Sequence, residues 1–176
     1  SISRFLDEFQ TKVEACSQIV FCASLQSRRK NFVEFSHEDF LESYKVNFLS
    51  TVQIIKFLTP MLSESYNPSI VIISSKVVET GGYRLYPYSS SKGALFVLCK
   101  SLSKELADFG IRLNSVMPGH LVEKLTKENK ISSELPVTTY KELCDTVEFL
   151  LSNHAEGIIG QSIILEGRNR TQTLTV

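Results

Sequence analysis

The sequence predicts an α/β fold in which a parallel β-sheet lies between two layers of helices. Segments with helical periodicity alternate with short apolar segments of strand length, beginning with residues 2–15 and 17–23. The short segments are apolar on both faces, as expected of strands that are covered on both sides. Turn residues such as Asn67-Pro68-Ser69 separate the segments. These observations predict four helix–strand units in succession.

In the first half of the chain, residues 2–15 carry apolar side chains on one helical face, and Ser1 or Ser3 can cap that helix. A buried strand follows at 17–23, and then a polar loop at 24–36. Acidic residues after Ser36 indicate the start of a long helix, which we expect to reach Leu58. Pro60 then marks a break or a kink.

In the second half, β-branched residues at 70–74 predict a buried strand, followed by a loop at 76–86. Pro87 opens a helix that Gly110 ends. The remaining elements are a strand at 111–116, a loop with a possible helix at 120–136, a helix capped by Thr138 or Thr139 and running to Leu151, and a strand at 161–165. We expect one α/β domain over residues 1–167 and a polar tail at 168–176.

Composition narrows the functional classes. Of 176 residues, 43% are hydrophobic and 22% charged, and the 19 basic residues balance the 19 acidic ones. No basic stripe with interleaved aromatics is present, so nucleic acid is not an expected partner. Arg28-Arg29-Lys30 is the single basic run and is interpreted as a solvated loop.

The cysteines and histidines show no metal-ligand spacing. Cys16, Cys22, Cys99 and Cys144 form no C-x-x-C pair, so we interpret them as small buried hydrophobes in a reducing compartment. No signal peptide is recognisable, and no apolar run is long enough to span a bilayer. We therefore expect a cytoplasmic protein without a membrane segment and without a metal.

Tyr88 and Lys92 carry the most specific chemical signal. A tyrosine acts as a general acid or base near neutral pH only if its pKa, ordinarily about 10, is lowered. A lysine ammonium one helical turn away lies on the same helix face and can do this. Ser75, at the end of a predicted strand, can place a hydroxyl beside the same group.

In combination, these residues resemble a known family. Tyr88-x-x-x-Lys92 occurs together with Ile73-Ser74-Ser75 after a buried strand, with Val46-Asn47-Phe48 in a helix, and with Pro118-Gly119 after the next strand. The chain thus resembles the C-terminal two-thirds of a short-chain dehydrogenase/reductase. The resemblance implies a doubly wound, Rossmann-like three-layer fold that lacks its first strands in this chain.

The resemblance also implies roles for individual residues. Tyr88 is the implied general acid/base, Lys92 lowers the pKa of the tyrosine and binds the nicotinamide ribose, and Ser75 polarises the substrate oxygen. Asn47 is implied to hold a water of a proton relay. Of the three histidines, His120 alone is expected near the cofactor. The implied cofactor-binding residues are Ala23, Ser24, Ile73, Tyr88, Lys92, Pro118, Gly119 and Leu121.

The sequence departs from the family pattern in four places. The glycine-rich phosphate turn is absent, together with the strand–helix units that surround it in the family. The absent part amounts to roughly 60–80 residues if each strand–helix unit takes about 30. Phe21-Cys22-Ala23-Ser24 stands where the family has N-N-A-G, Glu123 replaces a common threonine, and the substrate-lid segment 121–136 is short. We therefore expect this chain to be one piece of a longer protein, whose front half is a separate fragment or is separated from it by a disordered or cleaved loop.

Two functions remain open at this point. The first is an oxidoreductase that uses NAD or NADP, with NADP slightly preferred, on a small-molecule carbonyl or alcohol. The second is a non-catalytic binding or oligomerisation module with a truncated cofactor site. The family resemblance further implies a homodimer or homotetramer formed through the helices at 38–58 and 87–109. Val97, Leu98, Ser101, Leu102 and Leu106 can serve that contact or can face the chain's own sheet.

Overall fold

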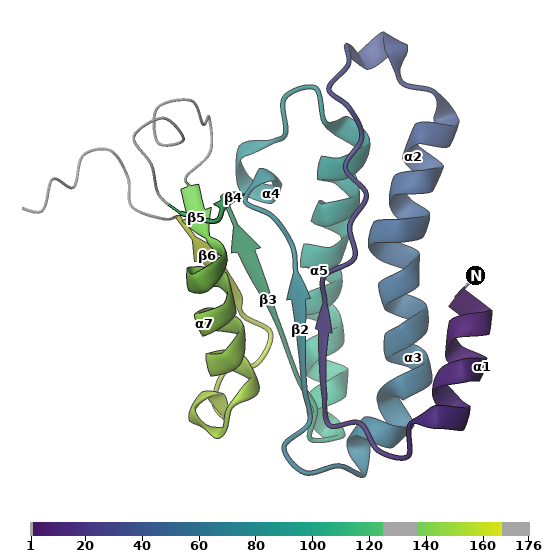
Figure 1. Cartoon of the computed structure of the whole chain (residues 1–176), viewed down its shortest axis with the longest axis vertical. Coiled ribbons are helices and arrows are strands. Elements are labelled where there is room, and N and C mark those ends of the chain that lie inside the picture. Colours follow the sequence, from purple (N-terminus) through teal and green to yellow (C-terminus); the bar gives the residue numbers. More distant parts are fainter. Residues whose placement is uncertain (1, 125–136, 167–176) are drawn as a thin grey trace, which may run out of the picture.

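A computed structural model describes residues 2–124 and 137–166 (Figure 1). Strands β1 (Gln18–Phe21), β2 (Ser69–Ile73), β3 (Arg112–Pro118) and β6 (Ser162–Leu165) form a parallel sheet in the order β1-β2-β3-β6. The predicted α/β class is confirmed. The register pairs Ile19 with Ile70 and Ile70 with Leu113, so apolar residues meet across the sheet.

The helices cover both faces of this sheet. Helices α1 (Ile2–Lys12), α2 (His37–Tyr44), α3 (Ser50–Ser63) and α5 (Tyr86–Asp108) lie on one side, and α7 (Tyr140–Leu151) lies on the other (Figure 1). Strand β2 shows why both layers form, because its successive side chains point to opposite faces. Ile70 and Ile72 enter the cluster beneath α3 and α5, whereas Val71 packs in the cluster beneath α7.

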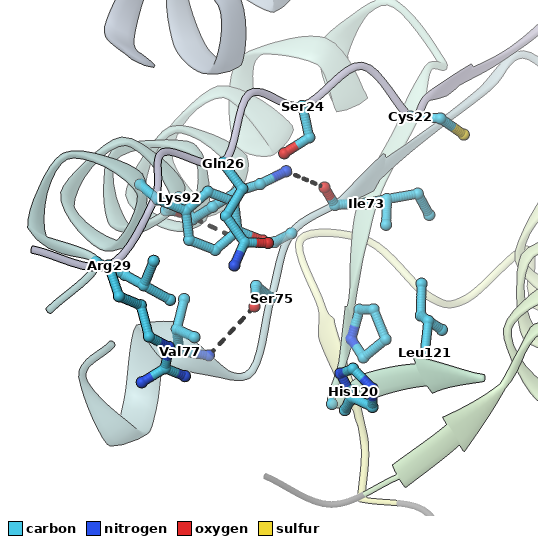
Figure 2. Close-up of a pocket in the computed structure, with 15 residues that line it drawn as sticks. Cys22, Ser24, Gln26, Arg29, Ile73, Ser75, Val77, Lys92, His120 and Leu121 are labelled. Carbon is cyan, nitrogen blue, oxygen red and sulfur yellow. Dashed lines mark hydrogen bonds between the residues drawn. The ribbon is translucent and has the colours of Figure 1, made fainter. Parts of the chain in front are cut away.

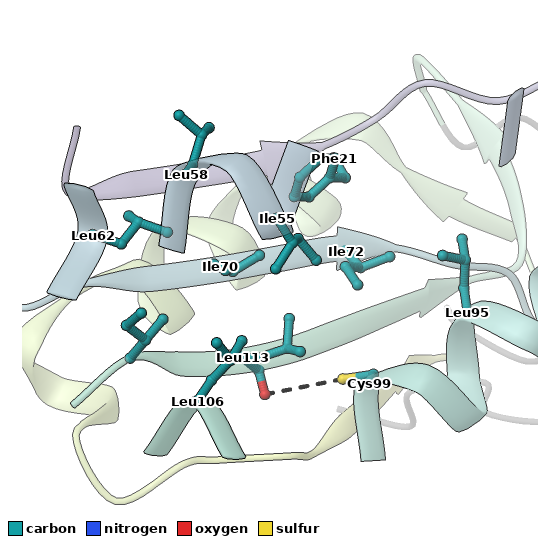
Figure 3. Packing of buried hydrophobic residues seen from close by; sticks show 11 residues of the cluster. Phe21, Ile55, Leu58, Leu62, Ile70, Ile72, Leu95, Cys99, Leu106 and Leu113 are labelled. Atoms are coloured by element: carbon teal, nitrogen blue, oxygen red, sulfur yellow. Dashed lines mark hydrogen bonds between the residues drawn. The ribbon is translucent and has the colours of Figure 1, made fainter. Parts of the chain in front are cut away.

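The larger core fills the space between the sheet and helices α3 and α5 (Figure 3). Leu62, Ile70, Ile111 and Leu113 in it have no exposed surface. The sequence left open whether five residues at 97–106 face the chain's own sheet or a partner subunit. Leu106 is buried in this core, and Leu98 and Leu102 pack against it, whereas Val97 is 63% exposed and Ser101 is exposed.

The expected long helix at 38–58 is interrupted, and Pro60 does not end it. Ser36 caps α2 by accepting a hydrogen bond from the Asp39 N–H, and a π-helical turn at Lys45–Leu49 joins α2 to α3. In that turn the Ser50 N–H donates to the Lys45 carbonyl, five residues back. Pro60 lies inside α3, which continues to Ser63. The turn places Asn47 inside the molecule, where its side chain is fully buried.

Several short elements differ from expectation. The first helix ends at Lys12, a 3-10 turn occupies Phe32–Glu34, and the loop at 76–86 contains helix α4 (Val77–Thr80). Strands β4 (His120–Val122) and β5 (Val137–Thr139) form a separate parallel pair that the sequence did not suggest. The last 3-10 turn is Asn153–Ala155.

The expected Thr139 cap of α7 is present: its hydroxyl accepts a hydrogen bond from the Glu142 N–H, and Glu142 returns one to the Thr139 N–H. Most of the expected lid and the polar tail at 168–176 lie outside the described residues.

All four strands of the main sheet run parallel, so their carboxyl ends share one edge (Figure 1). The segments that follow β1, β2 and β3 therefore converge there. Ligand sites of open α/β sheets form at this edge. The chain segments that carry Ser24, Ser75 and Gly119 meet at it.

Candidate active site

A cleft of about 400 Å³ opens at the carboxyl edge of the sheet (Figure 2). It collects side chains from the ends of β1, β2 and β3 and from the first turns of α5. Its lining residues are Cys22, Ser24, Gln26, Arg29, Ile73, Ser74, Ser75, Val77, Leu85, Tyr88, Lys92, Pro118, Gly119, His120 and Leu121.

Ser75 is held at the end of β2 by backbone pairing that extends beyond the strand. The Ser74 N–H donates to the Val116 carbonyl at 2.8 Å, and the Lys76 N–H donates to the Pro118 carbonyl at 2.9 Å. The Ser75 side chain is 7% exposed and its Oγ accepts a hydrogen bond from the Val77 N–H at 3.3 Å. Its hydroxyl hydrogen stays available to donate to an oxygen in the cleft.

Tyr88 and Lys92 reach the cleft from the start of α5. Pro87 lies in the first turn of this helix, where its missing N–H costs no helical hydrogen bond. The Lys92 Nζ lies 5.9 Å from the centroid of the Tyr88 ring and donates to the Ile73 carbonyl at 2.8 Å. The sequence-predicted pair therefore lies on one helix face, beside the strand end that carries Ser75.

Lys92 is 2% exposed, and its ammonium lies within the protein. Burial disfavours the charged form and lowers its pKa from 10.5 to about 8, while the nearby Cys22 thiol acts weakly in the opposite sense. A lysine with such a pKa is mostly protonated at neutral pH but can exchange its proton within the physiological range. Perturbed lysines of this kind are typical of functional sites.

Asn47 lies behind the cleft and does not line it. Its Oδ1 accepts from the Leu25 N–H at 2.6 Å, and its Nδ2 donates to the Leu25 carbonyl at 2.9 Å and to Ser91 Oγ at 2.8 Å. Both amide hydrogens are thus used within the protein. The side chain ties the loop after β1 to helix α5, immediately beside Lys92.

Pro118, Gly119, His120 and Leu121 line the cleft together. Figure 2 shows His120 and Leu121 across the cleft from Lys92 on α5. The Gly119 N–H lies 3.3 Å from the Leu165 carbonyl and 3.3 Å from Thr138 Oγ1, and Thr138 Oγ1 donates to the same carbonyl at 2.9 Å. These contacts fix the segment against β6 and β5. His120, which is expected near the cofactor, is one of these lining residues.

Seven of the eight expected cofactor residues line the cleft, and Ala23 does not. In this strand-end segment the side chains of Cys22 and Ser24 line it instead. The lining also includes four residues that no sequence pattern indicated, namely Gln26, Arg29, Val77 and Leu85. Gln26 and Arg29 follow β1, whereas Val77 and Leu85 lie between β2 and α5. Tertiary contacts hold these two segments together, such as the hydrogen bond from Arg29 to the Tyr83 carbonyl.

The cleft holds a buried cation and a tyrosine at the sheet edge where ligands of open α/β folds bind. Within residues 2–124 and 137–166, no group of three or more potential ligands could hold a metal ion. No helix in the same ranges is long and apolar enough to cross a membrane.

Comparisons with known proteins agree with this geometry. The family model described as short chain dehydrogenase matches residues 1–133. An uncharacterised oxidoreductase of Bacillus subtilis (strain 168) is 33% identical over 135 residues, which are 72% of this chain and 56% of that protein. The (3R)-3-hydroxyacyl-CoA dehydrogenase of Rattus norvegicus is 29% identical over 89% of this chain and 66% of that protein.

Two further matches cover more of the chain. A 3-oxoacyl-[acyl-carrier-protein] reductase of Aquifex aeolicus (strain VF5) is 30% identical over 95% of this chain and 71% of that protein. The crystal structure of a short chain dehydrogenase family protein from Francisella tularensis superposes with a TM-score of 0.82 at 24% identity, over 94% of this chain and 75% of that one. The chain thus spans about 56–71% of the length of these three curated relatives. On the family model and these relatives, the chain belongs to the short chain dehydrogenase family.

Proposed function

We propose that this chain carries the catalytic half of an NAD(P)-dependent oxidoreductase that interconverts a carbonyl and an alcohol. The observation that supports it most is the convergence of Tyr88, Ser75 and a buried Lys92 in one cleft. A reduced nicotinamide bound there supplies the hydride. Two of the relatives are named for hydroxyacyl and oxoacyl compounds, which carry this pair of functional groups.

In this proposal each side chain has a separate task. Ser75 Oγ donates a hydrogen bond to the substrate oxygen and polarises the carbonyl. Tyr88 gives its phenolic proton to that oxygen as negative charge develops on it. The Lys92 ammonium, 5.9 Å from the Tyr88 ring centroid, stabilises the phenolate that remains. Because its pKa is near 8, Lys92 can also return a proton near neutral pH.

Asn47 acts in this proposal by holding the helix that carries Lys92. With both amide hydrogens bonded to Leu25 and Ser91, its side chain has only a carbonyl lone pair left for a water. The family resemblance implies a water of a proton relay at Asn47, and in this proposal that water donates to the remaining lone pair.

The dinucleotide's phosphates need a further segment in this proposal. The chain contains no glycine-rich turn, and in the described residues β1 pairs with β2 alone. Val20 on β1 is 37% exposed, although it is a β-branched strand residue. We propose that strands carrying the phosphate turn pair with this edge of β1, within a longer chain or from a separate fragment.

The proposal also includes self-association through α3 and α5. An apolar hollow of about 660 Å³ lies between these helices, lined by Ile55, Pro60, Leu98, Leu102 and Phe109 among others. Phe109 is 50% exposed and Val97 63% exposed. A second copy of the same two helices can cover these side chains and form a homodimer, or a homotetramer by a further contact. Light-scattering mass at micromolar concentration tests this, and a monomeric mass contradicts it.

The catalytic proposal is tested by following reduced-nicotinamide absorbance with a panel of small ketones and oxoacyl thioesters. Tyr88→Phe removes only the proton donor, and we expect turnover to fall by about 10²–10⁴-fold, the usual contribution of general acid catalysis. Tyr140→Phe is the matched control, because Tyr140 lies at the start of α7 and is 54% exposed. Equal activity of the Tyr88→Phe variant and the control would refute the role of Tyr88.

One observation favours the binding-module alternative. Phe21 and Cys22 occupy the strand end where the family pattern has two asparagines, so polar contacts to the cofactor are reduced there. Nicotinamide fluorescence separates the two functions. Saturable binding of NADH or NADPH without turnover of any substrate supports a module, whereas binding with turnover supports the enzyme.

A further inference from the structure

Lys76 follows Ser75 directly, but its side chain turns away from the cleft and is not among the lining residues. Its Nζ lies 2.5 Å from Glu79 Oε2 on α4 and 2.8 Å from Glu166 Oε1 at the end of β6. The Lys76 side chain is 9% exposed. Hydrogen bonds to Glu166 and then to Glu79 raise its pKa, so the ammonium is held firmly in its charged form. One buried cation therefore bridges two carboxylates from separate elements.

The same residue joins a third segment through its backbone. The Lys76 N–H donates to the Pro118 carbonyl at 2.9 Å, and the next N–H along that segment, from Gly119, lies 3.3 Å from the Leu165 carbonyl. Leu165 immediately precedes Glu166, the partner of the Lys76 ammonium. The contacts thus close a ring from Lys76 to Pro118-Gly119, to Leu165-Glu166, and back to Lys76.

This ring connects the two sides of the cleft. Ser75 lies on one side, where it is proposed to hold the substrate oxygen. Pro118 and Gly119 lie on the other side, which is suited to the nicotinamide. Hydride transfer requires both reactants at a fixed separation, and a misplacement of about 1 Å can cost on the order of a hundredfold in rate.

We infer that Lys76 is a positioning residue, which fixes Ser75 relative to the Pro118-Gly119 segment through its bridge to Glu79 and Glu166. This inference rests on the proposed oxidoreductase function. Lys76 contacts neither substrate nor cofactor in it. It sets the distance across which the reaction takes place.

The bridge is poorly suited to a role in global stability. The Glu79 and Glu166 side chains are 44% and 56% exposed, and ion pairs with such accessible partners contribute little to folding. A residue that only stabilised the fold would change the unfolding midpoint and leave the balance of kinetic constants unaltered. A positioning residue changes kcat while both KM values and the midpoint stay nearly constant.

The test compares Lys76→Met, Glu166→Gln and Lys76→Arg with Lys104→Met, an exposed lysine on α5, as the control. For Lys76→Met we expect kcat to fall roughly ten- to a hundredfold with both KM values within about twofold. The primary deuterium isotope effect on kcat should rise, because hydride transfer becomes slower relative to product release. Lys76→Arg keeps a cation that can reach both carboxylates and should restore most of kcat. Glu166→Gln should show a smaller loss of the same kind, because Glu79 remains.

An unchanged kcat in Lys76→Met overturns the inference. A loss of kcat in Lys76→Met that Lys76→Arg does not restore also overturns it. The same holds if the loss of kcat equals the loss of folded protein. If the unmodified protein turns over no carbonyl substrate when the segment that carries the phosphate turn is supplied, the proposed function fails first. Amide hydrogen exchange at Gly119 then still tests the ring. Faster exchange in Lys76→Met but not in Lys104→Met supports the link, and equal exchange in both variants overturns it.

Discussion

Replacing Lys92 by methionine should make the protein more stable at neutral pH, although it removes a proposed catalytic group. The pKa of the buried ammonium is about 8, against its ordinary value of 10.5, a difference of 2.5. At 1.36 kcal/mol for each pKa unit, burying the charged form costs about 3 kcal/mol. Methionine fills a similar volume without this cost. The variant loses the hydrogen bond to the Ile73 carbonyl, which offsets about 1–2 kcal/mol of the gain.

The pH dependence gives the sharper measurement. Below pH 8 both folded and unfolded chains hold the Lys92 proton, so the burial cost is present in full. Between pH 8 and 10.5 the folded chain has released that proton while the unfolded chain still binds it. The free energy of unfolding of the unmodified protein therefore rises with pH in this window, by about 3 kcal/mol in all. Lys92→Met lacks this rise, so its advantage of about 1–2 kcal/mol at pH 7 should become a deficit of similar size at pH 10.5.

The assay is urea unfolding followed by far-UV circular dichroism at several pH values, since the chain contains no tryptophan to report by fluorescence. Cys99, whose pKa burial raises to about 11, titrates over an overlapping range, but it is present in both proteins and cancels in their difference. Lys104→Met serves as the control for loss of an exposed lysine. A difference between Lys92→Met and the unmodified protein that stays flat from pH 7 to 10.5 would refute the reasoning.

Three further predictions concern stability, each measured by the urea midpoint. Asn47→Ala breaks the buried link between Leu25 and Ser91 and should cost roughly 2–4 kcal/mol, and a loss below about 1 kcal/mol contradicts the role assigned to the amide. Thr139→Ala removes the cap of α7 and should cost about 1 kcal/mol, whereas an unchanged midpoint shows that the cap is dispensable. Gly160→Ala should cost at least 1–2 kcal/mol, because φ is +68° and the new Cβ would lie 2.5 Å from Ser103 Oγ. In the Gly160→Ala background, Ser103→Ala should restore only the stability lost to the steric clash. Full restoration of stability would show that the positive φ carries no strain.

The parts of the fold that the sequence predicted are those encoded locally. The strand at Ser69–Ile73 follows from a run of β-branched residues, and the helix that carries Tyr88 and Lys92 follows from Pro87 at its start and Gly110 at its end. The spacing of Tyr88 and Lys92 fixes their shared face in any α-helix. Ser75 lies close after the end of the same strand, so its position at the sheet edge follows from the strand itself.

The missed features depend on contacts distant in sequence. Strands His120–Val122 and Val137–Thr139 are three residues each and carry no periodicity of their own. Arg29 and Gln26 enter the cleft because their loop packs beside residues 83–85, as the bond from the Lys30 N–H to the Arg84 carbonyl shows. The π-helical turn contains Asn47, whose partners Leu25 and Ser91 lie 22 and 44 residues away, and no local pattern reveals them.

The π-helical turn between α2 and α3 also determines which changes in length this helical segment tolerates. A π-helical turn contains one residue more than an α-helical turn, so Lys45–Leu49 holds a surplus residue between two regular helices. Deleting one residue there would leave a continuous α-helix, in which α2 and α3 keep the same faces toward the core. The same deletion inside α3 would rotate everything after it by about 100°, the angle between successive residues. A one-residue deletion at 45–49 is therefore a length change in this helix that the core can absorb, and what it would forfeit is the inward position of Asn47.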